Sequence, residues 1–141
     1  MPTVSFRSLF LGACVAALMA APVAQACTGI ELIAKDGSVV HARTLEFGID
    51  LESTILMIPR GYARTGTTPD GTPGKTSVAK YASVGMNALG MDILVDGVNE
   101  KGLAVGLFYF PGSAGFMPYT KADAPNTVAD WELGSYLLEN T

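Results

Sequence analysis

Short apolar stretches broken by turn residues run through most of the chain, and this pattern is typical of β structure. Residues 27–34 and 38–44 alternate apolar with polar positions and are rich in branched side chains, so we predict two strands there. The Asp36-Gly37 dipeptide between them favours a tight hairpin turn. Further strands are predicted at residues 54–58, 81–89, 91–95 and 103–110, with a turn at 99–102 and a stop at Pro111-Gly112.

Two segments depart from this strand pattern. Residues 61–76 collect glycine, threonine and proline with almost no apolar residue, so a long exposed loop is predicted. Thr127, followed three residues later by Asp130, is similar to a capping box and predicts a helix that runs almost to Thr141. Such a helix needs a sheet to cover, which predicts an α+β fold. The apolar positions that fall mostly on one side of this helix are Val128, Trp131, Leu133, Tyr136, Leu137 and Leu138.

The first 26 residues differ from the rest of the chain in charge and hydropathy. They hold one charged side chain, Arg7, ahead of an apolar run over residues 9–21 that ends at Pro22. A membrane helix needs about 20 apolar residues, whereas a short apolar run behind a basic residue is typical of a secretory signal. Ala24-Gln25-Ala26 places small residues at both positions that a signal peptidase recognises. We therefore predict a signal peptide over 1–26 and a periplasmic or secreted chain that begins with Cys27.

A lipid anchor is the competing interpretation of this segment. A bacterial lipoprotein also begins with a cysteine after cleavage, but its signal prefers a leucine three residues earlier, where this chain has Ala24 before Cys27. Leu11-Gly12-Ala13-Cys14 does fit that preference, although few apolar residues precede it. Export with a free Cys27 is the interpretation that the pattern favours, and lipid attachment at a cysteine stays open.

Composition excludes several function classes. The 141 residues suit one domain, and the formal net charge is −4. Cleavage removes Arg7 and leaves eight basic against 13 acidic groups. This balance offers no cationic surface for nucleic acid. There is no glycine-rich phosphate loop, and one histidine with one remaining cysteine is too small a set for a structural zinc site, so we predict no metal and no cofactor.

The single cysteine left after cleavage is the strongest chemical signal in the sequence. A lone cysteine cannot form an internal disulfide. At the N-terminus, its thiol lies beside a free α-amine with an ordinary pKa of about 7.7–8.0, so that amine can act as a base for the thiol. Cys27 therefore needs no histidine partner, and we interpret His41, the only histidine, as a solvated strand residue.

An ordered set of motifs follows Cys27. These are Cys27-Thr28-Gly29, Ala42-Arg43-Thr44-Leu45-Glu46, Ile58-Pro59-Arg60-Gly61, Val98-Asn99-Glu100-Lys101-Gly102-Leu103 and Phe110-Pro111-Gly112. The set resembles the choloylglycine hydrolase family, the N-terminal-nucleophile amidases that include bile salt hydrolases and penicillin V acylases. The resemblance implies an αββα sandwich, in which two sheets lie between helix layers, and hydrolysis of a small-molecule linear amide.

The resemblance also implies roles for individual residues. Cys27 matches the nucleophile that forms a thioester with the acyl group, and Arg43 matches the arginine beside that thiol. Glu46 stands where familiar members have an aspartate near the N-terminal amine, and its extra methylene changes the reach of the carboxylate. Tyr109 matches the residue whose backbone N–H forms half of the oxyanion hole and whose side chain faces the acyl pocket. A tyrosine there favours a penicillin V acylase-like substrate over a bile salt, whereas Asn99 is interpreted as a turn residue.

Members of this family are usually much longer and complete the site with an asparagine and a second arginine from later in the chain. The sequence therefore predicts only the N-terminal part of the catalytic domain, over residues 27–141. No membrane contact is expected after signal cleavage, and a homo-oligomer stays open for the full-length protein. Two alternatives remain at this point. One is an inactive truncated remnant, and the other is a lipid-anchored binding protein that uses Cys27 for attachment.

Overall fold

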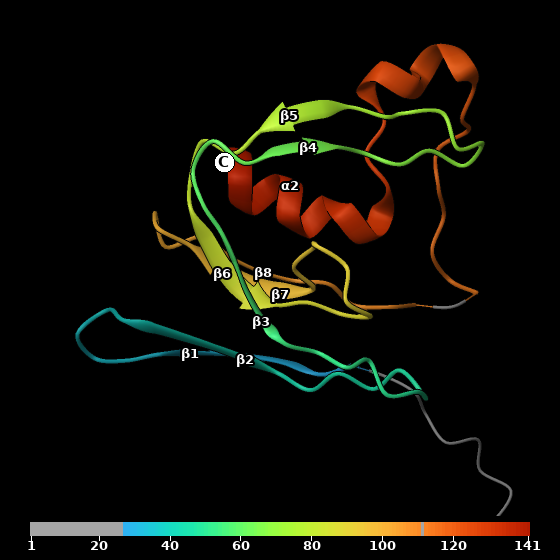
Figure 1. Ribbon diagram of the computed structural model, residues 1–141. Helices are drawn as coiled ribbons and strands as arrows, with labels where there is room; N and C mark the ends of the chain where they lie inside the picture. Colours follow the sequence, from blue (N-terminus) through green and yellow to red (C-terminus); the bar gives the residue numbers. More distant parts are fainter. Residues whose placement is uncertain (1–26, 111) are drawn as a thin grey trace, which may run out of the picture.

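A computed structural model describes residues 27–110 and 112–141; the predicted signal peptide lies outside this range. The described residues form three small antiparallel sheets and a C-terminal helix (Figure 1), which confirms the predicted α+β class. No helix of the described part is long and apolar enough to span a membrane. The strands are β1 (Gly29–Ile33), β2 (Val39–Arg43), β3 (Ile55–Ile58), β4 (Ala63–Thr65), β5 (Thr76–Val78), β6 (Ser83–Met86), β7 (Asp96–Asn99) and β8 (Ala104–Gly106). The helices are η1 (Lys121–Asn126), η2 (Asp130–Glu132) and α2 (Leu133–Asn140).

The predicted N-terminal hairpin is present. Strands β1 and β2 pair antiparallel, from Gly29 opposite Arg43 to Ile33 opposite Val39. The turn lies at Asp36-Gly37, where Gly37 takes a φ of +84° that only glycine adopts easily. The Asp36 carboxylate accepts hydrogen bonds from the backbone N–H and the hydroxyl of Ser38, which lowers the pKa of that carboxyl.

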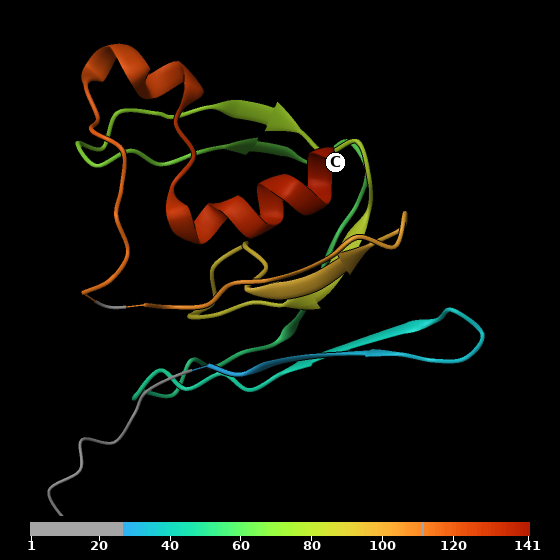
Figure 2. The same ribbon diagram turned by 180° about the vertical axis from the view of Figure 1, so that it is seen from behind.

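The central sheet has the strand order β3-β6-β7-β8, and α2 covers one of its faces. The hairpin β1–β2 lies on the other side of this sheet, as both views show (Figures 1 and 2). Under the helix, the core consists of Ile58, Ala79, Leu94 and Leu138. Gly85 and Gly97 are cross-strand partners in this sheet, and a Cβ on Gly85 would meet the Asp96 carbonyl oxygen at 1.9 Å. Only glycine permits so close an approach of the two backbones.

The interpretation of residues 61–76 as one exposed loop was wrong. This segment contains β4 and leads into β5, and the β4–β5 hairpin packs on α2 opposite the central sheet (Figure 1). Few apolar residues are needed there, because the buried groups are Arg64 and the glycines Gly66 and Gly74. A Cβ on Gly74 would lie 2.7 Å from the Thr127 carbonyl oxygen, so backbone-to-backbone contact replaces side-chain packing.

Two predicted strands also need correction. The apolar run at 91–95 forms no strand, and β7 begins only at Asp96. Leu89 and Gly90 both have positive φ and reverse the chain, after which the Asn87 side-chain amide donates to the Met91 carbonyl. The predicted strand at 103–110 is shorter than its apolar run, because β8 ends at Gly106. Both apolar runs line a pocket instead of continuing a sheet.

The C-terminal helix begins later than predicted and buries only part of the predicted apolar face. Thr127 does not cap it, since its hydroxyl donates to the Asp123 carbonyl, and the first helical turn is the 3₁₀ segment η2. Trp131 and Leu133 are about half exposed, at 50% and 46%. Leu138 is buried as predicted, and the other buried positions of α2 are Gly134, Ser135 and Glu139. A Cβ on Gly134 would lie 3.1 Å from the Leu94 carbonyl oxygen, so small residues let the helix approach the chain beneath it.

A buried ion pair holds α2 to the β4–β5 hairpin. Glu139 is fully buried and its carboxylate accepts three hydrogen bonds from Arg64, the shortest at 2.9 Å. Burial disfavours the charged guanidinium, but the hydrogen bonds and charge of Glu139 outweigh this, so the pKa of Arg64 is raised. Asp92 adds a second carboxylate 3.4 Å from Arg64, and the Tyr62 hydroxyl that donates to Asp92 lowers the pKa of that carboxyl.

Asn99 does more than the turn role that its motif predicts. Its carbonyl oxygen accepts the N–H groups of Lys101 and Leu103, which forms the predicted turn. Its amide group donates to the carbonyls of Leu138 and Thr141 at 2.9 and 3.0 Å. These carbonyls belong to the last turn of the helix and have no partner within it. Asn99 therefore attaches the end of α2 to the central sheet.

We predict that Glu139→Leu lowers the free energy of unfolding by about 3–5 kcal/mol, because it leaves the Arg64 cation buried without its partner. The double substitution Arg64→Met/Glu139→Leu should recover most of this loss, since both charges are removed. Urea unfolding monitored by circular dichroism measures the effect. Arg60→Met, which breaks an exposed pair with Glu100, is the matched control and should change the midpoint little. Equal losses in Glu139→Leu and Arg60→Met would contradict a stabilising role for the buried pair.

Candidate active site

The Cys27 thiol lies where the chain enters the N-terminal hairpin. The side chain is partly buried, and its Sγ lies 4.0 Å from the Glu46 carbonyl oxygen, within hydrogen-bond range for sulfur. The next residue, Thr28, forms two hydrogen bonds with Thr44: its N–H donates to the Thr44 hydroxyl, and its carbonyl accepts from the Thr44 N–H. The segment that starts with Cys27 is therefore held against the chain that leaves β2.

Arg43 reaches from the end of β2 into the central sheet. Its Nη1 donates to the Val95 carbonyl at 3.2 Å and also to the Leu107 carbonyl, and its Nε donates to Thr44. The guanidinium stacks on the Phe108 ring with its carbon 4.7 Å from the ring centroid. The Nη2 atom is buried and has no hydrogen-bond partner among the described residues. One side chain thus joins the cysteine-bearing hairpin to the chain on both sides of the β7–β8 pair.

The approach of the two segments requires glycine at position 29. Gly29 lies two residues after Cys27 and pairs with Arg43. A Cβ on Gly29 would lie 2.6 Å from the Phe108 ring. Phe108 therefore lies under the start of the hairpin, between Gly29 and the guanidinium of Arg43. The segment 107–109 is fixed close to the thiol-bearing end of β1 by this contact and by the arginine hydrogen bonds.

Glu46 is close to the thiol through its backbone and not through its carboxylate. Its carbonyl oxygen is the atom that contacts Sγ, while its side chain is exposed. The expected hydrogen bond between this carboxylate and the α-amine of a processed Cys27 stays a prediction. Tyr109 is 60% exposed, and its ring packs at a tilt of 56° on Phe47, with centroids 5.4 Å apart.

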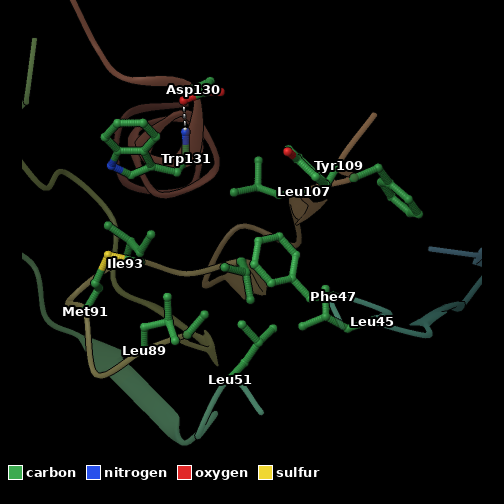
Figure 3. A pocket seen from close by; sticks show the side chains of 13 residues that line it. Leu45, Phe47, Leu51, Leu89, Met91, Ile93, Leu107, Tyr109, Asp130 and Trp131 are labelled. Carbon is green, nitrogen blue, oxygen red and sulfur yellow. Dashed lines mark hydrogen bonds between the residues drawn. The ribbon is translucent and has the colours of Figure 1, made fainter. Parts of the chain in front are cut away.

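An apolar pocket of about 240 Å³ opens between these segments (Figure 3). Tyr109 lies on its wall, and the predicted contact of this side chain with an acyl group stays a prediction. The sequence did not identify the other walls, because they come from segments whose apolar residues suggested strands and a helix face. The lining residues are Leu45, Phe47, Leu51, Ala88, Leu89, Met91, Ile93, Val95, Leu107, Phe108, Tyr109, Asp130 and Trp131.

His41 is not the solvated strand residue that the sequence suggested. Its Nε2 lies 3.3 Å from a carboxylate oxygen of Asp96, and both side chains are about three-quarters buried. A Cβ on Gly106 would lie 3.3 Å from both groups, so a glycine opposite Asp96 leaves room for the pair. His41 therefore provides a second polar link between the hairpin and the central sheet, two residues before Arg43.

Within residues 27–110 and 112–141, no three histidine, cysteine, aspartate or glutamate side chains gather in a way that could hold a metal ion. The arrangement therefore offers four features for chemistry. These are a thiol, a fixed cation, a backbone segment beside both, and an apolar pocket. Features of these four kinds also occur in acyl-transfer sites.

Comparisons with known proteins agree with this chemistry. Residues 27–141 match the sequence profile of the linear amide C-N hydrolases, choloylglycine hydrolase family. A bile salt hydrolase/transferase of Bifidobacterium longum is 30% identical over 114 residues, which cover 81% of this chain and 35% of that protein. A bile salt hydrolase/transferase of Clostridium perfringens is 31% identical over 99 residues, 69% of this chain and 28% of that protein.

A penicillin V acylase of Pectobacterium atrosepticum is 33% identical over 108 residues, which cover 72% of this chain and 27% of that protein. The chain thus spans about a third of the length of the curated relatives that it matches. No solved structure matches it at a significant level.

We predict that His41 and Asp96 stabilise the docking of the hairpin jointly. In a double-mutant cycle of His41→Ala and Asp96→Ala, the coupling energy should be about 0.5–1.5 kcal/mol. Hydrogen exchange of the β1–β2 amides is the measurement, because it reports opening of this hairpin in particular. Ser38→Ala at the far end of the hairpin is the control, and its effect should add to that of Asp96→Ala. A coupling energy of zero would show that the 3.3 Å contact contributes nothing.

Proposed function

Because the chain belongs to the choloylglycine hydrolase family of linear amide C-N hydrolases, we propose that it is the N-terminal part of an exported N-terminal cysteine amidase. The observation that carries this proposal is the reach of Arg43. Its hydrogen bonds to Val95 and Leu107 hold the hairpin that begins at Cys27 beside the 107–109 segment. A nucleophile, a cation and a candidate oxyanion donor thereby share one end of the structure.

The proposed αββα sandwich is supported by the faces of the central sheet. One face carries α2, and the hairpin β1–β2 lies on the opposite side (Figure 2). Side chains that point toward the hairpin side remain exposed, with Ile55 at 76% and Met57 at 73%. Met86 lies opposite Ile55, Val84 lies opposite Met57, and Val98 lies opposite Val84, so this face continues with apolar residues. A second sheet packed on this face, with the hairpin as part of it, would remove these side chains from water.

The proposed reaction begins after cleavage before Cys27, which frees the α-amine. The amine takes the thiol proton, and Sγ attacks the carbonyl carbon of the substrate amide. The C–N bond then breaks, the proton passes from the α-ammonium to the leaving amine, and the acyl group remains as a thioester on Sγ. Water gives a proton to the α-amine and attacks the thioester. Release of the acid returns the proton to the thiol, so every atom and charge is accounted for.

The protein groups around the thiol have complementary roles in this scheme. The backbone N–H of Tyr109 is proposed as a donor to the oxyanion of the tetrahedral intermediate, and no described carbonyl accepts a hydrogen bond from it. The Arg43 cation favours the thiolate by its charge. The Glu46 carboxylate is proposed to hold the α-ammonium, while its carbonyl oxygen positions Sγ.

The pocket supports an aromatic or aliphatic acyl group. Phe47, Phe108 and Tyr109 supply three aromatic rings next to the segment that touches the thiol. Rings add contact area and lose little rotamer freedom on binding. We therefore propose a preference for phenoxyacetyl or acyl-chain amides, of the kind that a penicillin V acylase accepts, over conjugated bile salts.

The processing of Cys27 is tested by expressing the chain with residues 1–26 in a bacterium that has a periplasm. The exported product should have the mass of residues 27–141, and incubation with penicillin V should add one phenoxyacetyl group. Cys27→Ala should remove this adduct. Ala24→Asp, which blocks signal cleavage, should also remove it although the thiol is retained. A product that keeps Met1, or a mass increase equal to a diacylglycerol, would contradict the proposal.

The proposed acyl preference is tested by Tyr109→Asn. The ratio of kcat/KM for penicillin V to kcat/KM for glycocholate should fall about tenfold, because the contact between the ring and the acyl group is lost. In a chain without turnover, the acylation rate of Cys27 replaces kcat/KM. Tyr109→Phe is the matched control and should keep the ratio, since the ring is retained. If both variants behave alike, Tyr109 does not select the acyl group.

A further inference from the structure

The pocket lining contains one carboxylate, that of Asp130, and it lies at the end of the pocket away from the thiol. Leu45 and Phe47 flank Glu46, whose carbonyl touches Sγ, so they mark the side of the pocket near the nucleophile. Figure 3 shows Asp130 and Trp131 away from Leu45, at the end formed by the 3₁₀ segment η2. An acyl group whose carbonyl lies at the thiol would extend toward this end.

Asp130 has no cation beside it in the pocket. The lining contains no lysine or arginine, and no described ion pair includes Asp130. One carboxylate oxygen accepts a hydrogen bond from the Trp131 backbone N–H at 2.9 Å. The side chain is exposed and belongs to the pocket lining.

Trp131 adds a second element that attracts cations. Its side chain is half exposed and lines the same end of the pocket as Asp130. An indole ring attracts an ammonium group through its negative face, and this attraction adds to the charge of a nearby carboxylate. The other lining residues are apolar apart from the Tyr109 hydroxyl, so they do not oppose the selection by charge.

We propose that Asp130 and Trp131 select the charge at the far end of the acyl group. The pocket takes acyl groups that end in an ammonium, accepts neutral ones more weakly, and disfavours those that end in a carboxylate. The physical reason is the unpaired carboxylate at the edge of an apolar pocket, where an incoming anion is repelled and a cation is attracted. This inference rests on the proposed function only for which end of the ligand lies near the thiol.

The test uses the fact that Trp131 is the single tryptophan of the chain. Its fluorescence reports directly on the pocket and needs no catalysis. The probes are three phenylacetamides with a para hydrogen, a para aminomethyl or a para carboxymethyl group, titrated at neutral pH and low salt. The cationic probe should bind about five- to tenfold more tightly than the anionic one, with the neutral probe between them.

Three variants make the outcome decisive. Asp130→Asn keeps an acceptor for the Trp131 N–H and should bring all three affinities within about twofold of one another. Asp130→Lys should reverse their order. Glu31→Gln, on the hairpin and outside the pocket, removes the same unit of charge and should leave the order unchanged. Equal affinities in the unchanged chain, or an order that survives Asp130→Lys, would overturn the inference.

Failure of this inference and failure of the proposed function give different results. If the charge order holds but Cys27 is never acylated, the pocket selects cations and the amidase proposal fails. If Cys27 is acylated by penicillin V while the three probes bind alike, the amidase proposal survives and the selection by Asp130 is wrong. Circular dichroism of each variant verifies that the fold is retained.

Discussion

The contact on which the rest of this structure depends is that of the Arg43 guanidinium with the central sheet. The hairpin β1–β2 is a two-stranded unit, and such a unit has little stability in water by itself. Arg43 attaches it through two backbone carbonyls and the Phe108 ring, and His41 attaches it through Asp96. These links are polar and directional, so they fix the position of Cys27 in a way that apolar packing alone would not. The proposed chemistry depends on that position.

The sequence predicted the local structure where a local signal determines it. The N-terminal hairpin formed as expected because Asp36-Gly37 selects the turn, and alternation selects the strands. Tyr109 lines an apolar pocket, and its role beside the acyl group, which the family resemblance implies, stays a prediction. The α+β class was also correct. The proposed catalytic roles of Cys27, Arg43, Glu46 and Tyr109 stay predictions that the experiments above address.

The features that the sequence did not reveal are those in which polar groups take interior positions. Residues 61–76 were predicted as a loop because an arginine such as Arg64 is expected at the surface. The sequence pattern does not show that Glu139 lies opposite it. His41 was predicted to be solvated, because the sequence pattern does not show that Asp96, 55 positions away, lies beside it. The spacing of apolar residues cannot predict such pairs, because a charged side chain is tolerated in the interior only when a partner from a distant part of the chain lies beside it.

The C-terminal helix is a second element whose buried side differs from the prediction, and this difference concerns residues of the pocket. Its apolar side was expected to face the sheet, but of that side only Leu138 is fully buried, and the small residues Gly134 and Ser135 are buried beside it. Small and hydrogen-bonded groups there permit a close approach, and the Leu94 N–H donates a hydrogen bond to the Ser135 hydroxyl oxygen at 2.7 Å. Trp131 and Asp130, which belong to η2, line the pocket. The C-terminal segment therefore contributes to two apolar regions: α2 packs tightly on the core, and η2 lines the open pocket. A single hydrophobic face could not have served both.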